Sequence, residues 1–212
     1  MFDAVKDVIA AGALQLFEDL LWEWTGVIKR VVRVWGQEDV PWWYNERASL
    51  SLFAGAIWKA GGIAFEEFSS EREHLPSEDL TEVVLQRGRI DLYFSYRGEE
   101  FVAEAKQCWP RIGRRAQSAQ AEIEYALQQA VAAVQTAQEV YGQRLAIVFA
   151  SPYFPQAELQ EAHACLTKWQ QAVAGVACDC KAVYWLHECP WAQDEGAIYP
   201  GGAVFIKQVT AR

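Results

Sequence analysis

The clearest alternation of apolar and polar positions lies in two short segments, residues 89–94 and 101–106. Side chains of a β-strand point to opposite faces of a sheet in turn, and both segments have this period of two. A polar break containing Gly98 separates them, and glycine suits the tight turn of a hairpin. The pattern therefore predicts two antiparallel strands joined by a short turn.

A helical period marks the segment 45–60. Four residues share one stripe of this helix: Glu46, Leu50, Phe53 and Ile57. Asn45 is a good N-cap before it, and the two glycines at 61–62 are a strong stop signal after it. Glu46 thus stands at the top of a core-facing stripe, where a solvated charge does not normally lie.

The N-terminal segment, residues 4–34, also has a helical pattern. Its apolar stripe contains Leu20, Trp24, Val27 and Val31. Gly12 and Gly26 weaken the helix, so the pattern fits one long helix or two shorter ones. The stripe offers a surface for a second copy of the chain, and a homodimer through this segment is one expectation.

The remaining elements follow from shorter patterns. Residues 63–68 are expected to form a strand, and 76–84 fit either a loop or a short helix. After Pro110 the chain predicts helices and apolar strands in the order 114–140 (helix), 145–150 (strand), 155–174 (helix), 182–186 (strand) and 203–209 (strand). This order indicates an α/β fold, a mixed central β-sheet flanked by helices. Residues 1–40 are assigned to an N-terminal helical extension and residues 41–212 to the α/β domain.

Composition fits a folded chain. Its 212 residues are 52% hydrophobic and 22% charged, which excludes general disorder and is enough for one substantial core. Glu18, Asp19 and Glu23 interrupt the best candidate for a membrane span, so no membrane association is expected. The first residues lack the positive region of a secretory signal, and the expected location is cytoplasmic.

The hairpin carries the candidate chemistry. If the two strands pair, Asp91 approaches Glu104, and Lys106 shares the face of Glu104. Two carboxylates that converge need a cation between them, and a hard divalent ion with oxygen ligands fits. The Ala105 carbonyl and waters would complete the ion's ligands. Lys106 would then orient or deprotonate a water beside a phosphate, an arrangement for metal-assisted phosphodiester hydrolysis.

These residues resemble a known family. Asp91, twelve intervening residues and then Glu104, Ala105 and Lys106 are similar to the core motif of the PD-(D/E)XK nuclease superfamily, with Ile90 in place of the familiar proline. The resemblance covers about residues 43–150 and implies a restriction-endonuclease-like core. Members carry a further acidic residue on a helix before the motif, and Glu46 matches it. The resemblance also implies Mg²⁺ as cofactor, which Mn²⁺ can replace, and DNA as substrate.

The charge pattern qualifies this interpretation. The net charge of −9 is unusual for a nucleic-acid enzyme, because non-specific binding relies on Lys and Arg. Residues 105–121, however, contain no acidic residue and hold four basic ones: Lys106, Arg111, Arg114 and Arg115. This strip fits either phosphate contacts or a solvated loop. A second strip, residues 25–37, holds Lys29, Arg30 and Arg33, for which interaction with a helix C-terminus is the preferred interpretation.

Other candidate ligands rank lower. Four acidic residues near the first predicted strand are alternatives to Glu46: Glu66, Glu67, Glu71 and Glu73. The chain has five cysteines, Cys108, Cys165, Cys178, Cys180 and Cys189. An odd number in a cytoplasmic chain is typical of free, mostly buried thiols, and a metal or iron–sulfur site from the last four is the alternative.

Two classes of function follow. The favoured one is a divalent-metal-dependent nuclease that hydrolyses phosphodiester bonds in DNA. The alternative is a catalytically inactive nuclease-like fold that serves as a nucleic-acid-binding or protein-assembly module. The low overall basicity favours the second class, and the set Glu46, Asp91, Glu104 and Lys106 favours the first.

Overall fold

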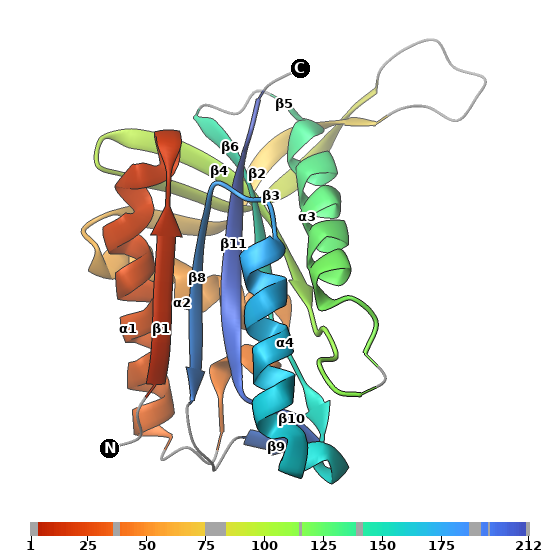
Figure 1. Cartoon of the computed structure of the whole chain (residues 1–212). Coiled ribbons are helices and arrows are strands. Elements are labelled where there is room, and N and C mark those ends of the chain that lie inside the picture. The colour runs from red at the N-terminus through yellow and green to blue at the C-terminus, as the bar shows by residue number, and fades with distance from the viewer. Residues whose placement is uncertain are drawn as a thin grey trace, which may run out of the picture.

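A mixed β-sheet runs through the whole molecule (Figure 1). The computed structural model describes residues 4–35, 39–74, 84–114, 116–138, 142–186, 192–194 and 196–210. Within them, eight strands pair in the order β1-β8-β11-β6-β4-β3-β2-β5, and only β4 and β6 are parallel. Their bounds are β1 Ala4–Ala10, β2 Ile63–His74, β3 Val84–Tyr96, β4 Glu99–Cys108, β5 Ala137–Gln138, β6 Gln143–Ala150, β8 Cys180–Leu186 and β11 Gly201–Val209.

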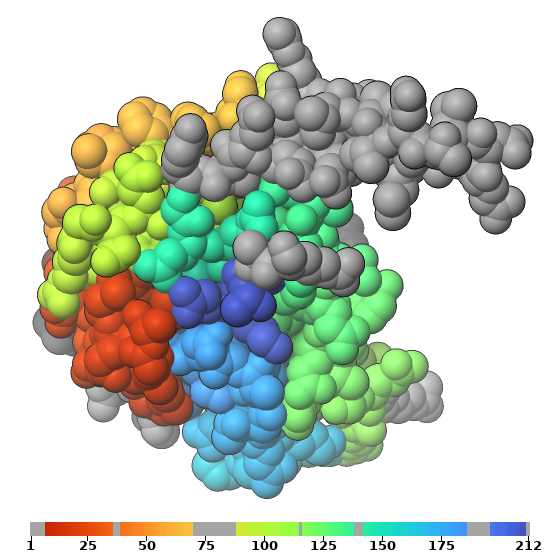
Figure 2. All heavy atoms as spheres, turned by 90° about the horizontal axis from the view of Figure 1, so that it is seen from above, coloured from red at the N-terminus to blue at the C-terminus, as the bar shows by residue number. Residues whose placement is uncertain are grey.

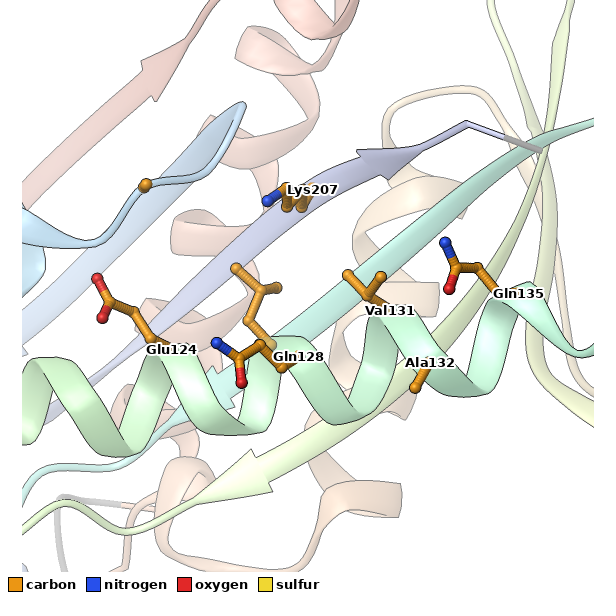
Figure 3. Close-up of a pocket in the computed structure, with 8 residues that line it drawn as sticks. Glu124, Gln128, Val131, Ala132, Gln135 and Lys207 are labelled. Atoms are coloured by element: carbon orange, nitrogen blue, oxygen red, sulfur yellow. The ribbon is translucent and has the colours of Figure 1, made fainter. Parts of the chain in front are cut away.

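Helices cover both faces of this sheet. One face carries α1 (Glu18–Val34) and α2 (Glu46–Lys59), and the other carries α3 (Ala119–Gln135) and α4 (Ala162–Gly175) (Figures 1 and 3). On the first face, Phe53 of α2 packs edge-on against Phe94 of β3 and Phe149 of β6. These layers confirm the predicted α/β class with a mixed sheet between helices.

The start of the chain differs from the prediction. The segment predicted as helix from residue 4 begins with strand β1, which pairs with β8 at the edge of the sheet. A short 3₁₀ helix, η1 (Gly12–Phe17), follows before α1 begins. Gly12 has φ 58°, a conformation that favours glycine and separates the two elements. Seen from above, the N-terminal residues (red) lie against the C-terminal strands (blue), so this segment forms part of the sheet (Figure 2).

The second helix agrees with the sequence pattern. Asn45 accepts a hydrogen bond of 3.0 Å from the Ala48 amide, which caps the first turn of α2. The helix ends at Lys59, and Gly61 adopts φ 87°. Strand β2 follows and runs beyond the predicted 63–68.

The predicted hairpin is formed by β3 and β4. Arg97 and Gly98 connect them with φ values of 52° and 82°. Positive φ at both central residues is typical of the type I′ turn, whose twist matches that of the flanking strands. Residues 75–83, which hold most of the ambiguous segment 76–84, lie outside the described residues.

The second half of the chain follows the prediction with shorter helices. The helix predicted over 114–140 is α3, which starts later because Ser118 caps it by accepting from the Ala121 amide at 3.2 Å. The helix predicted over 155–174 begins as a 3₁₀ turn, η3 (Gln156–Glu161), before α4. The three predicted strands are β6, β8 and β11. The sequence did not reveal the small sheet of β7 (Phe154–Pro155), β10 (Ala197–Tyr199) and β9 (Ala192–Asp194).

Among the helices of the described residues, none has the length and apolar character needed to cross a bilayer.

Candidate active site

The two strands of the β3–β4 hairpin separate at the end opposite the turn, and we call this point the fork. The two strands pair only as far as Leu92 and Ala103. Beyond that point β3 stays paired with β2, whereas β4 stays paired with β6. Asp91 and Glu104 are the next residues on the two diverging strands, so one carboxylate stands on each side of the fork.

Asp91 bridges the fork. Its Oδ2 accepts a hydrogen bond of 2.8 Å from the Ala105 amide, which has no ladder partner on β3. The aspartate therefore satisfies a main-chain donor of β4 at the point where the sheet divides. Glu104 lies deeper, with only 3% of its surface exposed. A charge at that depth is stable only with compensating partners, which distinguishes Glu104 from an ordinary surface glutamate.

Lys106 lies on the same side of β4 as Glu104. Its Nζ donates a hydrogen bond of 2.7 Å to the Ala105 carbonyl and lies 4.0 Å from Oε2 of Glu46. About a third of the lysine side chain remains exposed. The ammonium group therefore lies at the fork with access to solvent.

Glu46 reaches the fork from the first turn of α2. Its Oε2 accepts a hydrogen bond of 3.1 Å from the Gln107 amide. Burial raises the pKa of the Glu46 carboxyl; the Lys106 ammonium opposes that rise, the Asp91 carboxylate adds to it, and the Gln107 amide opposes it. The structure thus brings Glu46, Asp91 and Lys106 close together from three elements, and Glu104 follows the last β3–β4 pair on the side of β4 that also carries Lys106.

The donors at the fork fit a hard cation. Asp91, Glu104 and the Ala105 carbonyl offer oxygen ligands of the kind that Mg²⁺ prefers, and Glu46 is a further carboxylate nearby. Among the described residues, no three His, Cys, Asp or Glu side chains come together as a metal-binding group. The candidate donors are two carboxylates and a carbonyl, and the Lys106 ammonium donates a hydrogen bond to that carbonyl.

The alternative carboxylates have other partners. Glu66 accepts a hydrogen bond of 3.0 Å from the Ser51 hydroxyl. Glu67 forms ion pairs with Arg47 and Arg89. The side chains of Glu71 and Glu73 lie outside the described residues. Sequence reasoning missed Arg47 and Arg89, although each lies within two residues of a predicted site carboxylate.

An aromatic cluster lies beside the fork on β2 and β3. Glu67, opposite Asp91, adopts φ 52°, which costs about 1 kcal/mol in an L-residue. The left-handed backbone conformation of Glu67 interrupts the alternation of side chains along β2. Phe65 and Phe68 therefore lie on the same face, and both stack on Tyr93, with ring centroids 6.3 and 5.1 Å away. Phe65 is 51% exposed and Phe68 42%. Alternation along the sequence did not indicate this shared face.

The predicted basic strip is largely paired. Arg111 forms an ion pair of 3.0 Å with Glu158, and Arg114 pairs with Glu161. The Arg114 amide also donates to Glu158 at 2.7 Å, and this bond, ahead of the contact with Arg111, lowers the pKa of the Glu158 carboxyl. Arg115 lies outside the described residues. Both described arginines are therefore paired with glutamates of η3.

A separate pocket of about 380 Å³ lies between α3 and β11 (Figure 3). Glu124 and Gln128 of α3 and Lys207 of β11 contribute its polar groups, and Leu127 and Val131 contribute apolar surface. It contains no residue of the predicted site.

The cysteines confirm one prediction in part. Cys108, Cys165, Cys178 and Cys180 are free thiols, whereas Cys189 lies outside the described residues. Burial, with a smaller effect of Glu122, raises the pKa of Cys108 to about 12. Burial likewise raises the pKa of Cys180. A thiolate is the form that binds metals, and both environments disfavour it.

The chain matches no protein-family model, and neither the curated proteins nor the solved structures gave a match.

Proposed function

We propose that this protein is a divalent-metal-dependent nuclease of the PD-(D/E)XK type, hydrolysing phosphodiester bonds in DNA. One observation carries the proposal. Asp91 and Glu104 are the first residues beyond the last pair of the two diverging strands, and the solvent-accessible ammonium of Lys106 lies on the same side of β4 as Glu104. This combination of hard ligands and a solvent-accessible ammonium group suits phosphodiester hydrolysis.

Each residue would have a distinct role. A bound Mg²⁺ or Mn²⁺ would polarise the scissile phosphate and favour deprotonation of a bound water. Asp91, Glu104 and the Ala105 carbonyl would hold the ion. Lys106 would leave the Ala105 carbonyl to orient or deprotonate the attacking water. Glu46 would add a further carboxylate near the ion, and its Oε2 lies 4.0 Å from Nζ of Lys106.

Two further features support the proposal. The helix with Glu46, the hairpin with the motif, then α3 and the apolar strand β6 follow one another in the order that the resemblance implies. The exposed rings of Phe65 and Phe68 could stack on a base next to the fork.

Four free thiols fit the reducing cytoplasm, which we propose as the compartment.

The test is cleavage by purified protein. Labelled single-stranded and duplex DNA and RNA are incubated with Mg²⁺ or Mn²⁺ across a range of salt, with EDTA, Asp91→Ala and Lys106→Ala as controls. We expect metal-dependent cleavage of DNA that EDTA and both variants abolish. Chelator-sensitive cleavage that both variants retain would identify a contaminant and reject the mechanism.

A second candidate is the inactive nuclease-like module. It is favoured by the pairing of Arg111 and Arg114 with glutamates, which reduces the positive surface near the site. In that case the wild type would bind Mn²⁺ weakly or not at all and would cleave none of the substrates.

A further inference from the structure

The outer surfaces of α1 and α2 enclose a groove of about 710 Å³. We call it the α1–α2 groove. Lys29, Arg30 and Arg33 line it from α1, and Trp58 and Lys59 line it from α2. Of the described residues that line it, none is acidic. Four cations thus gather in one hollow on a protein whose net charge is −9.

Among the described residues, only one of these four cations has an ion-pair partner. Lys59 pairs with Glu23 of α1. Within the part of the chain that the structure describes, Lys29, Arg30 and Arg33 form no ion pair. They lie within about one turn of each other, and like charges at such spacing destabilise a helix slightly. The repulsion among these three side chains is relieved when an anion with several charges binds between them.

The groove also presents an aromatic surface. Trp58 is 54% exposed, and a side chain added at Gly55 would meet no atom within 4 Å. Glycine therefore keeps the floor of the groove open next to the indole ring. Cations beside an exposed aromatic ring are the combination with which proteins hold single-stranded nucleic acid, through phosphate contacts and base stacking.

A helix end, a membrane and a second copy of the chain fit the groove less well. A helix C-terminus attracts cations, but this concerns only α1 and leaves Trp58 and Lys59 of α2 unexplained. An anionic membrane surface would meet the cations but is too broad to enter the hollow between the two helices. A second copy of the chain would bring two cationic grooves together.

We propose that the α1–α2 groove binds a single-stranded nucleic acid, with Lys29, Arg30 and Arg33 contacting phosphates and Trp58 stacking on a base. The groove and the fork lie along the same helix. Glu46 and Trp58 are twelve residues apart in α2, which corresponds to about 18 Å. Binding at the groove needs neither metal nor cleavage, so it can be tested apart from the proposed nuclease activity.

The experiment measures fluorescence anisotropy of a labelled thymidine 12-mer in EDTA at low salt. Arg30→Glu should weaken binding about tenfold or more, because it removes one phosphate contact and adds repulsion. Lys207→Glu changes the net charge equally on the opposite face of the sheet, and it should bind like the wild type. Gly55→Leu fills the groove without altering charge, and Trp58→Ala removes the ring; both should weaken binding. Thermal unfolding verifies that each variant is folded.

Salt dependence gives a second measure. The slope of log affinity against log salt should fall by about 0.7 for each phosphate contact that a substitution removes. The fall should therefore be about 2 in the variant with Lys29, Arg30 and Arg33 all replaced by alanine. Wild-type affinity and slope in that variant would overturn the proposal. So would binding of Arg30→Glu and Lys207→Glu at equal strength. Sedimentation with phosphatidylserine vesicles that depends on Arg30, without binding of the oligonucleotide, would assign the groove to membranes instead.

Discussion

The Asp91 carboxylate accepts a hydrogen bond of 2.8 Å from the Ala105 amide across the point where β3 and β4 part. One residue therefore both holds the fork together and supplies a carboxylate to the proposed metal site. These two roles respond differently to substitution, because an amide side chain can still accept a hydrogen bond but binds Mg²⁺ or Mn²⁺ much less well.

This difference gives the first prediction. Asp91→Ala should lose Mn²⁺ binding and also about 1–3 kcal/mol of stability, since it leaves the Ala105 amide without its acceptor. Asp91→Asn should lose the metal but retain most of the stability. Calorimetric titration with Mn²⁺ and urea unfolding measure the two effects. If Asp91→Asn binds Mn²⁺ like the wild type, Asp91 is not a ligand.

The β3–β4 hairpin could be predicted because its signals are local, whereas the separation of the two strands beyond Leu92 and Ala103 was not predicted. Alternation placed Glu104 and Lys106 on one face, and the hairpin turn at Gly98 set the register in which Asp91 and Glu104 are the next residues after the last pair. The pairing of Arg111 with Glu158 joins residues 47 positions apart, so no local pattern could reveal it. Strand β1 was missed for the same reason, because its partner β8 lies at the other end of the chain.

Lys106 gives the second prediction. Its Nζ donates to the Ala105 carbonyl without being a metal ligand, so Lys106→Ala should keep the fold and the Mn²⁺ affinity. Cleavage should fall about a hundredfold or more, the usual loss when a water-orienting or basic group is removed. Single-turnover kinetics at saturating metal measure this loss. Reduced Mn²⁺ affinity in Lys106→Ala would instead indicate that the lysine shapes the metal site.

Glu46 gives the third prediction, which concerns pH. Its pKa in the folded protein is raised, chiefly by burial and further by Asp91. A carboxyl with a raised folded pKa binds more protons in the native than in the unfolded state, so stability is lost as pH rises through the folded pKa. Glu46→Gln keeps an acceptor for the Gln107 amide but removes the charge. It should therefore raise the thermal midpoint at pH 7, and this gain should vanish below the unfolded pKa of about 4.5.

The same variant should lose activity while it gains stability. Melting curves of the wild type and Glu46→Gln from pH 4 to pH 8 provide the comparison, with Gly55→Ala on the same helix as a control that touches no carboxylate. A stabilisation that is independent of pH would show that the charge of Glu46 is not the cause.

The last prediction concerns the paired arginines. Glu158 and Glu161 neutralise Arg111 and Arg114 just beyond the end of β4, the strand that carries Glu104 and Lys106. If these arginines contact phosphates when substrate binds, the glutamates compete with the substrate for them. Replacing both glutamates with glutamine should then strengthen binding of DNA and steepen its salt dependence, because more counterions are released from the bound strand.

Replacing Arg111 and Arg114 with alanine should have the opposite effect on the salt slope, and Mn²⁺ binding should stay intact in both double variants. The matched control is Glu18→Gln with Asp19→Asn, which changes the net charge by the same amount on α1. Equal gains in affinity from the control and from Glu158→Gln with Glu161→Gln would mean that only the overall charge of the protein matters. If only the variant with Glu158→Gln and Glu161→Gln binds DNA more tightly, the ion pairs of Arg111 and Arg114 limit the phosphate contacts of these arginines. The freed guanidinium groups would then act near the site, since they lie only a few residues beyond Lys106 in the sequence.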